Sequence, residues 1–359
     1  MARTLTSRRR IGFALTAVAL AVAIPILAIT GVDLWLHARY ARWLGYNSRG
    51  YRGAVVGGKR PGEYRIVLLG GSTAYGYAVA PAETISVFLE RDLQTRSRSN
   101  RFTVINLAYN NEGAYSFAYT LSDYAYLHYD LAILFEGYND LTDEPQNTSV
   151  FRHQSAIFRS TGYLPIFPLI FREKAAALLH GGNAAAMYPL YRGDKTVFHP
   201  SWTHRTSAAV LTSSAAIEEA LERQFSSVSP PTPAAQDVVR STGCSHVPFY
   251  CQSIARAVDV ARTNGTQVLV ATQPYVLGNV RARHVLQQED MAAMLVRRYQ
   301  ADGNVRYVNL GNTLDLSDER LSGDRMHPTA EGNARIAAAL VEPVTRLAAS
   351  ASVPQASGR

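Results

Sequence analysis

The stretch RIVLLGGSTAYG, residues 65–76, begins with an apolar run and ends in a glycine-rich turn that carries Ser72. The apolar run 66–69 is typical of a strand buried on both faces, as in a parallel sheet. Gly70 and Gly71 allow the backbone to turn sharply after such a strand. The stretch therefore predicts a β-strand followed by a turn that presents Ser72, either as the N-cap of the next helix or as a functional hydroxyl.

Four further apolar runs are similar to the first and alternate with helical patterns. The five predicted strands span residues 65–69, 102–107, 131–135, 267–272 and 305–310, and the predicted helices span 82–93, 116–127, 253–264, 287–301 and 330–347. Such alternation is typical of βαβ units with right-handed crossovers. The sequence therefore predicts an α/β fold: a three-layer α/β/α sandwich with a five-stranded parallel sheet of the flavodoxin-like kind, in which ligands bind at the carboxyl ends of the strands.

The segment between the third and fourth predicted strands breaks this alternation. It is about 130 residues long, too long for a structureless loop in a compact domain, so we predict a mostly helical insertion over residues 145–250. Its features are an aromatic, proline-broken patch at 163–171, helical patterns near 174–179 and 207–225, and a proline-rich linker at 226–233. The insertion could cap the site and touch a bilayer through the patch, or form a satellite core. We assign residues 63–348 to the domain that contains the insertion and 349–359 to a disordered tail.

The segment IGFALTAVALAVAIPILAITG, residues 11–31, carries no charged side chain. About 20 apolar residues span a hydrocarbon core of about 30 Å as a helix, so we predict a transmembrane helix. A cleaved signal peptide is the competing interpretation, because Arg8–Arg10 precede the segment, but its length and the lack of a small-x-small site favour an anchor. A small bias in positive charge places the basic residues 1–10 in the cytoplasm and makes 32–62 a juxtamembrane connector.

The composition indicates a globular chain and gives no sign of nucleic-acid binding. Of 359 residues, 47% are hydrophobic and 18% charged, and the net charge of +8 forms no basic stripe with interleaved aromatic residues. Cys244 and Cys251, separated by six residues in GCSHVPFYC, are typical of a local disulfide in an exported domain; two buried free thiols are the alternative. Together with the apolar segment, they predict a single-pass protein whose main domain lies outside the cytoplasmic membrane, in a periplasm or at a cell surface.

Four short motifs lie where this sandwich would gather them. They are Gly70–Thr73 after the first strand, Asn110–Gly113 after the second, Gly137–Asp140 after the third and Asp324–Pro328 after the fifth. A serine hydroxyl becomes a good nucleophile when a neighbouring imidazole accepts its proton, and His327 can be that base for Ser72. Asp324, three residues earlier, can hold the imidazole tautomer and stabilise the imidazolium.

Three hydrogen-bond donors are available for the oxyanion of an acyl-transfer reaction. They are the backbone N–H of Ser72, the backbone N–H of Gly113 and the side-chain amide of Asn139. We expect Asp140 to brace its turn, and we leave the role of Glu136 open between substrate binding and pairing with an arginine. The other histidines are scattered without the spacing of a metal site, so we predict no metal and no other cofactor.

Ser72, Gly113, Asn139 and His327, in this order and in these contexts, resemble the four marker residues of the SGNH hydrolases, also known as the GDSL esterase and lipase family. The first motif is similar to a Gly-Gly-Ser variant, in which Gly71 replaces the aspartate of the family's name. All four motifs in order are far more specific than any one of them alone.

The resemblance covers roughly residues 63–145 and 265–345. It implies the SGNH hydrolase fold and an ester hydrolase with Ser72 as nucleophile, His327 as base and Asp324 behind it. The implied substrate is an acylated carbohydrate or lipid of the cell envelope, reached from the membrane through the N-terminal helix. Two alternatives stay open: a polysaccharide O-acetyltransferase that uses the same acyl-enzyme, and a non-catalytic binding module on the same fold.

Two other enzyme classes fit the sequence less well. Gly70–Ala74 is similar to the G-x-S-x-G elbow of α/β-hydrolases with alanine in the last place, but in those enzymes the acid and the histidine lie on separate loops, whereas Asp324 and His327 share one motif. A dinucleotide-binding fold lacks support, because the turn is not G-x-G-x-x-G and no acidic residue ends the second strand.

Overall fold

The computed structural model describes residues 7–40, 46–97, 101–110, 112–141, 150–167 and 243–351. The chain divides into two units, which are Met1–Ala41 with Pro165–Ser229 and Arg42–Leu164 with Pro230–Arg359. The second unit contains the five described strands. Outside the described residues lie the predicted helical patterns 174–179 and 207–225, the linker 226–233 and most of the predicted tail.

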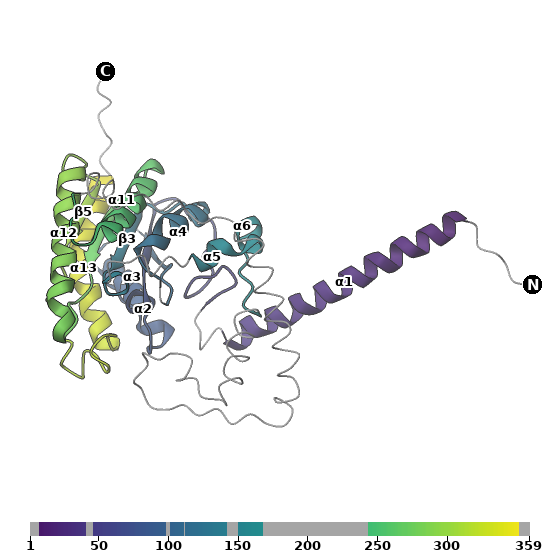
Figure 1. Ribbon diagram of the computed structural model, residues 1–359, viewed down its shortest axis with the longest axis horizontal. Coiled ribbons are helices and arrows are strands. Elements are labelled where there is room, and N and C mark those ends of the chain that lie inside the picture. Colours follow the sequence, from purple (N-terminus) through teal and green to yellow (C-terminus); the bar gives the residue numbers. More distant parts are fainter. Residues whose placement is uncertain are drawn as a thin grey trace, which may run out of the picture. The chain divides into compact units, whose positions relative to one another are not determined.

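Five parallel strands form one sheet in the second unit (Figure 1). They are β1 (Glu63–Gly70), β2 (Arg101–Asn106), β3 (Leu131–Glu136), β4 (Gln267–Thr272) and β5 (Val305–Val308). Their order across the sheet is β2-β1-β3-β4-β5, and every neighbouring pair is parallel. The predicted flavodoxin-like sheet is thereby confirmed, and each strand overlaps its predicted range.

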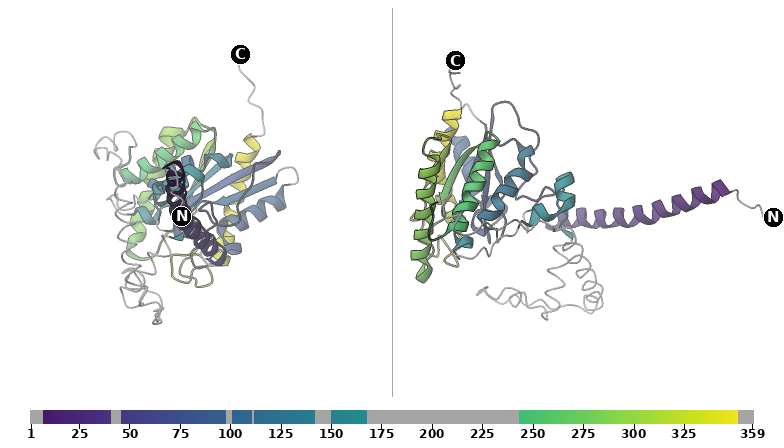
Figure 2. Two further views of the ribbon diagram at one scale, coloured as in Figure 1. Left: turned by 90° about the vertical axis from the view of Figure 1, so that its right-hand side faces the viewer. Right: turned by 45° about the horizontal axis from the view of Figure 1, so that its top comes forward.

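Helices cover both faces of this sheet (Figure 2). One face packs against α3 (Ile85–Arg96) and α13 (Ala330–Ala351), and the other against α4 (Phe117–Asp123), α11 (Pro248–Thr263) and α12 (Arg281–Tyr299). Within β1, Ile66 and Leu68 belong to the first core, and Val67 and Leu69 to the second. This division follows from the alternation of side chains along a strand. The three-layer sandwich is therefore confirmed.

The helix boundaries differ from the predicted ones at several places; α12, for example, begins at Arg281 rather than at residue 287. The predicted helix 116–127 is divided into η2 (Ala114–Ser116), α4 and η3 (Ala125–Leu127). Helix α11 begins earlier than predicted, with Pro248 in its first turn, where a missing N–H costs nothing. Helix α13 continues to Ala351, past the start of the predicted tail. Other short helices of the main unit include α2 (Ser72–Tyr75), η1 (Pro81–Glu83), η4 (Tyr138–Asp140) and η5 (Gly278–Val280).

Part of the predicted juxtamembrane connector is built into the main unit. Tyr51 is buried in the core under α4 and α11. Arg52 is 6% exposed, and its Nη1 donates hydrogen bonds to the carbonyl oxygens of Tyr75 at 3.0 Å and Gly76 at 2.9 Å. A cation is favourable at these carbonyls, because they belong to the C-terminal end of α2. The connector therefore stabilises the short helix that begins with Ser72.

The described start of the predicted insertion forms two short helices, α5 (Phe151–Gln154) and α6 (Ala156–Thr161). Phe158 and Leu164 are buried in the same core as Tyr124. This portion therefore packs as an extension of the main core. A cap over the site formed by the rest of the insertion stays a prediction.

Cys244 and Cys251 form a disulfide with an S–S distance of 2.10 Å. Both residues are buried beside the first turns of α11. The predicted local disulfide is thereby confirmed over the alternative of two free thiols.

The apolar N-terminal segment is one continuous helix, α1 (Ser7–Tyr40). Among the described residues it is the one helix, over Ile11–Arg39, that is long and apolar enough to cross a membrane. Most of its large apolar side chains are exposed, for example Leu27 at 69%, although Leu36 is buried. Such a helix could be a membrane anchor or a signal sequence, because both meet the same criteria of length and composition.

Candidate active site

The order of the strands brings the ends of β1 and β3 together. These two strands are neighbours at the point where the strand order reverses, and Gly70 of β1 pairs with Phe135 of β3. Ser72 follows β1 at the start of α2, and Asn139 follows β3 on η4. In sheets of this kind, ligands bind in the crevice at such a reversal. The fold therefore places two of the predicted motifs at the expected ligand-binding edge.

Gly70 and Gly71 are required by the close approach of the β3 segment. A Cβ on Gly70 would lie 2.2 Å from the carbonyl oxygen of Phe135. A Cβ on Gly71 would lie 2.2 Å from Nδ2 of Asn139 and 2.7 Å from Oε2 of Glu136. Such distances are sterically forbidden, because non-bonded heavy atoms pack at about 3.5–4 Å. The two glycines therefore let the Ser72 turn lie directly against the turn that carries Asn139.

Ser72, His327 and Asp324 form a continuous chain of hydrogen bonds. The Oγ of Ser72 lies 2.9 Å from Nε2 of His327, and Nδ1 of His327 lies 2.6 Å from Oδ2 of Asp324. The two ring nitrogens therefore contact different partners, so that Nδ1–H can donate to the carboxylate while Nε2 accepts the serine proton. The structure thus brings together the three residues in the order that the sequence predicted.

A local turn prepares the carboxylate of Asp324. Its Oδ1 accepts hydrogen bonds from the backbone N–H groups of Met326 at 3.0 Å and His327 at 2.7 Å. Arg325, inside the turn, has a left-handed φ of 66°, which is uncommon for a residue with a side chain. Partial burial would raise the pKa of Asp324, but the hydrogen bonds from the side chain and backbone of His327 outweigh it and lower this pKa to about 2. The carboxylate is therefore ionised throughout the neutral range.

Asn139 presents an amide N–H at the same place. Its Nδ2 donates one hydrogen bond, of 2.7 Å, to the carbonyl oxygen of Glu112, which leaves the second hydrogen for a ligand. The backbone N–H groups of Ser72 and Gly113 donate to no acceptor within the described part of the chain. Asn139 Nδ2 lies beside Gly71, which precedes Ser72, and beside Glu112, which precedes Gly113. The three predicted donors therefore lie close together.

A buried ion pair, absent from the sequence-based prediction, holds the segment before Gly113. The Oε2 of Glu112 lies 3.0 Å from Nη2 of Arg152, and the two side chains are 3% and 2% exposed. Burial raises the pKa of Glu112, and the charge of Arg152 opposes this rise. The two residues lie 40 positions apart, and Arg152 belongs to the predicted insertion, so no spacing in the sequence links them.

Asp140 braces the site as expected. Its Oδ2 accepts a hydrogen bond of 2.8 Å from the backbone N–H of Ala114, which ties η4 to the segment after Gly113. Burial raises the pKa of Asp140.

The sequence did not single out Tyr77, although its ring flanks the imidazole of His327. The centroids of the two rings lie 4.7 Å apart. Of the second motif, Asn111 lies outside the described residues. The described residues contain no group of His, Cys, Asp and Glu side chains that could hold a metal ion.

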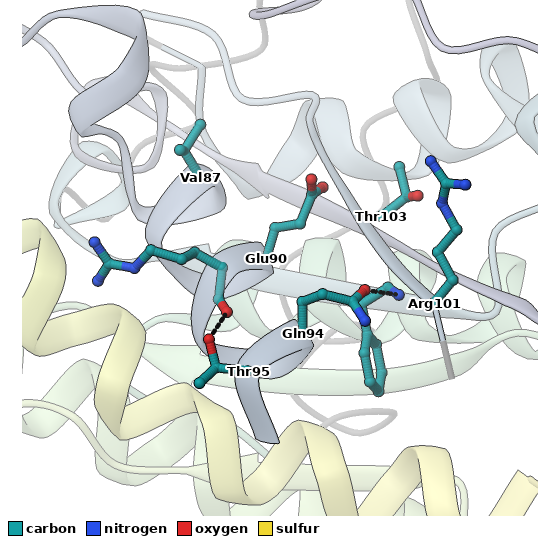
Figure 3. Close-up of a pocket in the computed structure, with 8 residues that line it drawn as sticks. Val87, Glu90, Gln94, Thr95, Arg101 and Thr103 are labelled. Carbon is teal, nitrogen blue, oxygen red and sulfur yellow. Dashed lines mark hydrogen bonds between the residues drawn. The ribbon is translucent and has the colours of Figure 1, made fainter. Parts of the chain in front are cut away.

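Figure 3 shows a pocket away from these residues, between α3 and the edge strand β2. Its lining residues are Val87, Glu90, Arg91, Gln94, Thr95, Arg101, Phe102 and Thr103. Side-chain oxygens of Glu90 and Gln94 accept the N–H groups of Val104 at 2.7 Å and Phe102 at 3.1 Å. These bonds satisfy backbone donors that an edge strand leaves open. The pocket therefore reflects protection of the sheet edge, and no predicted site residue lines it.

A family model and several solved structures are similar to this chain. Residues 68–335 match the model of the GDSL-like lipase/acylhydrolase family. Similar solved structures include a member of the lipolytic protein G-D-S-L family from Veillonella parvula DSM 2008, with 13% identity over 79% of this chain and 100% of that chain and a TM-score of 0.41. Another is the lipase/acylhydrolase from Enterococcus faecalis, with 13% identity over 79% and 96% of the two chains and a TM-score of 0.42.

A third is a family two carbohydrate esterase from Clostridium thermocellum in complex with cellohexaose, with 10% identity over 82% of this chain and 67% of that chain and a TM-score of 0.40. A comparison with curated proteins gave no match. The family assignment depends on the family model, whose match runs from β1 into α13 and takes in Ser72, Gly113, Asn139 and His327. The chain therefore belongs to the GDSL-like lipase/acylhydrolase family and is a hydrolase that acts on ester bonds.

Proposed function

We propose that this chain is a serine esterase of the SGNH type that removes acyl groups from an acylated carbohydrate or lipid of the cell envelope, with Ser72, His327 and Asp324 as its catalytic triad. The observation that carries the proposal is the 2.9 Å contact between Oγ of Ser72 and Nε2 of His327. A general base must lie within about 2.6–3.2 Å of the group whose proton it takes, and this contact meets that condition.

In the first half of the reaction, Oγ of Ser72 attacks the carbonyl carbon of the ester while its proton passes to Nε2 of His327. The ionised Asp324 stabilises the resulting imidazolium through Nδ1. The bond to the leaving alcohol then breaks, and the alcohol takes the proton from Nε2. In the second half, a water molecule attacks the acyl-serine with His327 again as base, and Ser72 regains its hydrogen as the carboxylic acid leaves.

The developing oxyanion is held by the N–H groups of Ser72 and Gly113 and by Nδ2 of Asn139. Donors of this kind act strongly because they are already positioned before charge develops, and removal of one typically costs about 10²–10³ in kcat. The hydrogen bond from Asn139 to the Glu112 carbonyl supports this role, since it fixes the amide while one N–H stays available.

Two features favour a substrate in the cell envelope. Helix α1 has the length and composition of an anchor or a signal sequence, and either would direct the main unit to the membrane or across it. The Cys244–Cys251 disulfide is typical of oxidising compartments outside the cytoplasm. An acylated carbohydrate or lipid of the envelope is an ester that a hydrolase there would meet.

The test is the hydrolysis of p-nitrophenyl acetate and longer p-nitrophenyl esters by the full-length protein in detergent, compared with Ser72→Ala. We expect Ser72→Ala to lower kcat/KM at least about 10⁴-fold, because the nucleophile is lost. Ser160→Ala, which removes an exposed hydroxyl on α6, is the matched control and should leave activity unchanged. Equal activity of the wild type and Ser72→Ala, or no activity of either on any chain length, would contradict the proposal.

A further inference from the structure

Glu136 is the last residue of β3 and is only 1% exposed. The sequence left two roles open for it, namely substrate binding and pairing with an arginine. Its burial separates it from any substrate in the crevice, and no ion pair links it to an arginine within the described part of the chain. A buried carboxyl group beside the Ser72 and Asn139 turns therefore calls for a different explanation.

One oxygen of Glu136 shapes the turn that carries Asn139. Its Oε1 accepts hydrogen bonds from the backbone N–H groups of Gly137 at 2.9 Å and Asn139 at 3.3 Å. These two N–H groups lie at the start of η4, where a short helix leaves its first donors without backbone partners. The carboxyl group therefore fixes the orientation of η4 relative to the end of β3.

The other oxygen of Glu136 fills the space that Gly71 leaves empty. A Cβ on Gly71 would lie 2.7 Å from Oε2 of Glu136 and 2.2 Å from Nδ2 of Asn139. In the family's name this position, directly before the nucleophile serine, is an aspartate. Here the carboxyl group comes from the next strand of the sheet, and it borders the same space as the amide that we propose as an oxyanion donor.

The surroundings of Glu136 favour its neutral form. Burial raises its pKa to about 8, the nearby carboxyl of Asp140 adds to the rise, and the backbone N–H groups around it offset only part of it. On α11, the hydroxyl of Tyr250 donates to the Glu136 carbonyl at 3.3 Å. On α12, Nε2 of His284 lies 2.6 Å from where a Cβ of Gly137 would be, and burial lowers the pKa of His284 to about 4, so this imidazole is uncharged.

The remaining charged neighbour is Glu112, whose carbonyl oxygen lies 3.0 Å from the position of a Gly71 Cβ. Its own carboxylate pairs with Arg152. The groups around Glu136 on η4, α11, α12 and the segment before Gly113 thus include the carboxyls of Asp140 and Glu112, the hydroxyl of Tyr250 and the uncharged imidazole of His284, whose pKa the charge of Arg281 on α12 also lowers. Within the described part of the chain, no lysine or arginine forms an ion pair that would stabilise an ionised Glu136.

We propose that Glu136 is a positioning residue for the oxyanion-binding turn and that it acts as a neutral carboxylic acid in the space left by Gly71. The inference rests on the proposed serine esterase activity. Neutrality matters because an ionised Oε2 would attract the second N–H of Asn139 and repel the oxyanion that this N–H must stabilise. Evidence for this role would be an alkaline loss of activity that depends on residue 136.

The test compares the pH profiles of kcat/KM for p-nitrophenyl acetate, between about pH 5 and 9.5, in full-length wild type, Glu136→Gln and Glu136→Ala. Glutamine keeps an oxygen that accepts both N–H groups and cannot ionise, so we expect activity within about threefold of the wild type below pH 7 and no decline above pH 8. Alanine removes the acceptor, and we expect about a 100-fold lower kcat with little change in KM, as for loss of one oxyanion donor.

Two control variants make the result specific. Asp140→Asn keeps an acceptor for the Ala114 N–H but removes a like charge, so the alkaline decline should persist and move to lower pH. Glu289→Gln, at an exposed position of α12, should reproduce the wild-type profile. Thermal unfolding of each variant separates loss of activity from loss of folding, and the Glu136→Gln profile decides the question even if Glu136→Ala does not fold.

Two results would overturn the inference while leaving the esterase mechanism intact. One is a Glu136→Gln variant as impaired as Glu136→Ala below pH 7, and the other is an alkaline decline in Glu136→Gln identical to that of the wild type. If Ser72→Ala in the same assay were as active as the wild type, the proposed function itself would fail, and the inference with it.

Discussion

The two halves of the site are built in opposite ways. The Asp324–His327 half depends on a turn of four residues, and the Asp324 side chain is 51% exposed. The Asn139 half depends on contacts between distant segments, since Asn139 donates to the Glu112 carbonyl and the Glu112 side chain pairs with Arg152 with an exposure of only 3%. One half is local and accessible to solvent, and the other is long-range and buried.

The carboxyl groups of the two halves show what this difference does. Hydrogen bonds from His327 lower the pKa of Asp324 to about 2, whereas burial raises the pKa of Glu136 to about 8. The same chemical group is thus ionised in one half and neutral in the other. Substitutions in the exposed half should therefore act mainly on rate, and substitutions in the buried half should act on both rate and stability.

The largest effect is expected for His327→Ala, which removes the proposed general base in the exposed half. We predict a decrease of about 10⁴- to 10⁶-fold in kcat, because residues of a triad act as a unit. The melting temperature should stay close to that of the wild type. His246→Ala is a suitable control, since His246 also lies 3.0 Å from a carboxylate, that of Asp290, but outside the site. A decrease below tenfold in kcat would show that another base serves Ser72.

The second largest effect is expected for Asp324→Asn. We predict a loss of about 10⁴-fold in kcat, because the amide favours the wrong imidazole tautomer.

The pH dependence of stability offers a second measurement on the same variant. Asp324 has a lowered pKa, so its contribution to stability is fully present above the ordinary aspartate value of about 3.9 and is lost as the pH falls toward about 2. Unfolding between pH 2 and 5 should therefore depend less on pH in the variant, and an unchanged dependence would contradict this prediction.

In the buried half, Arg152→Ala should destabilise the protein by about 3–5 kcal/mol, because it leaves the buried Glu112 without its partner. The matched control is Arg335→Ala, which breaks an exposed pair with Glu331 on α13 and should cost about 0.5 kcal/mol or less. Denaturant unfolding of both variants measures the difference. Equal costs would mean that the Glu112 segment does not depend on its ion pair.

The smallest effect of the series is expected for Asn139→Ala, with about a 10²- to 10³-fold decrease in kcat and little change in KM. The reason is that the amide acts on charge that develops only in the transition state. Asn312→Ala, at an exposed position after β5, where the side chain accepts a hydrogen bond of 3.0 Å from Arg281, serves as the control. An increase in KM with unchanged kcat would instead assign Asn139 to substrate binding.

Much of this arrangement could be predicted because it depends on local patterns. The buried run before Gly70 and the four similar runs identify the strands, since residues in a parallel sheet are apolar on both faces. The pairing of Asp324 with His327 follows from their spacing of three residues. The boundaries of α4 were less predictable, because the chain there passes through two 3₁₀ segments whose geometry depends on packing.

The sequence by itself determined the five strands, the apolar N-terminal helix and the order of the four motifs, because each follows from periodicity, length or short spacing. Only the tertiary structure decided which distant side chains support these motifs: Arg52 at the end of α2, Arg152 beside Glu112, and Glu136 in the space of Gly71. The physical reason is that burial and close approach assign such partners, and both depend on how distant segments pack rather than on the residues next to them in the chain.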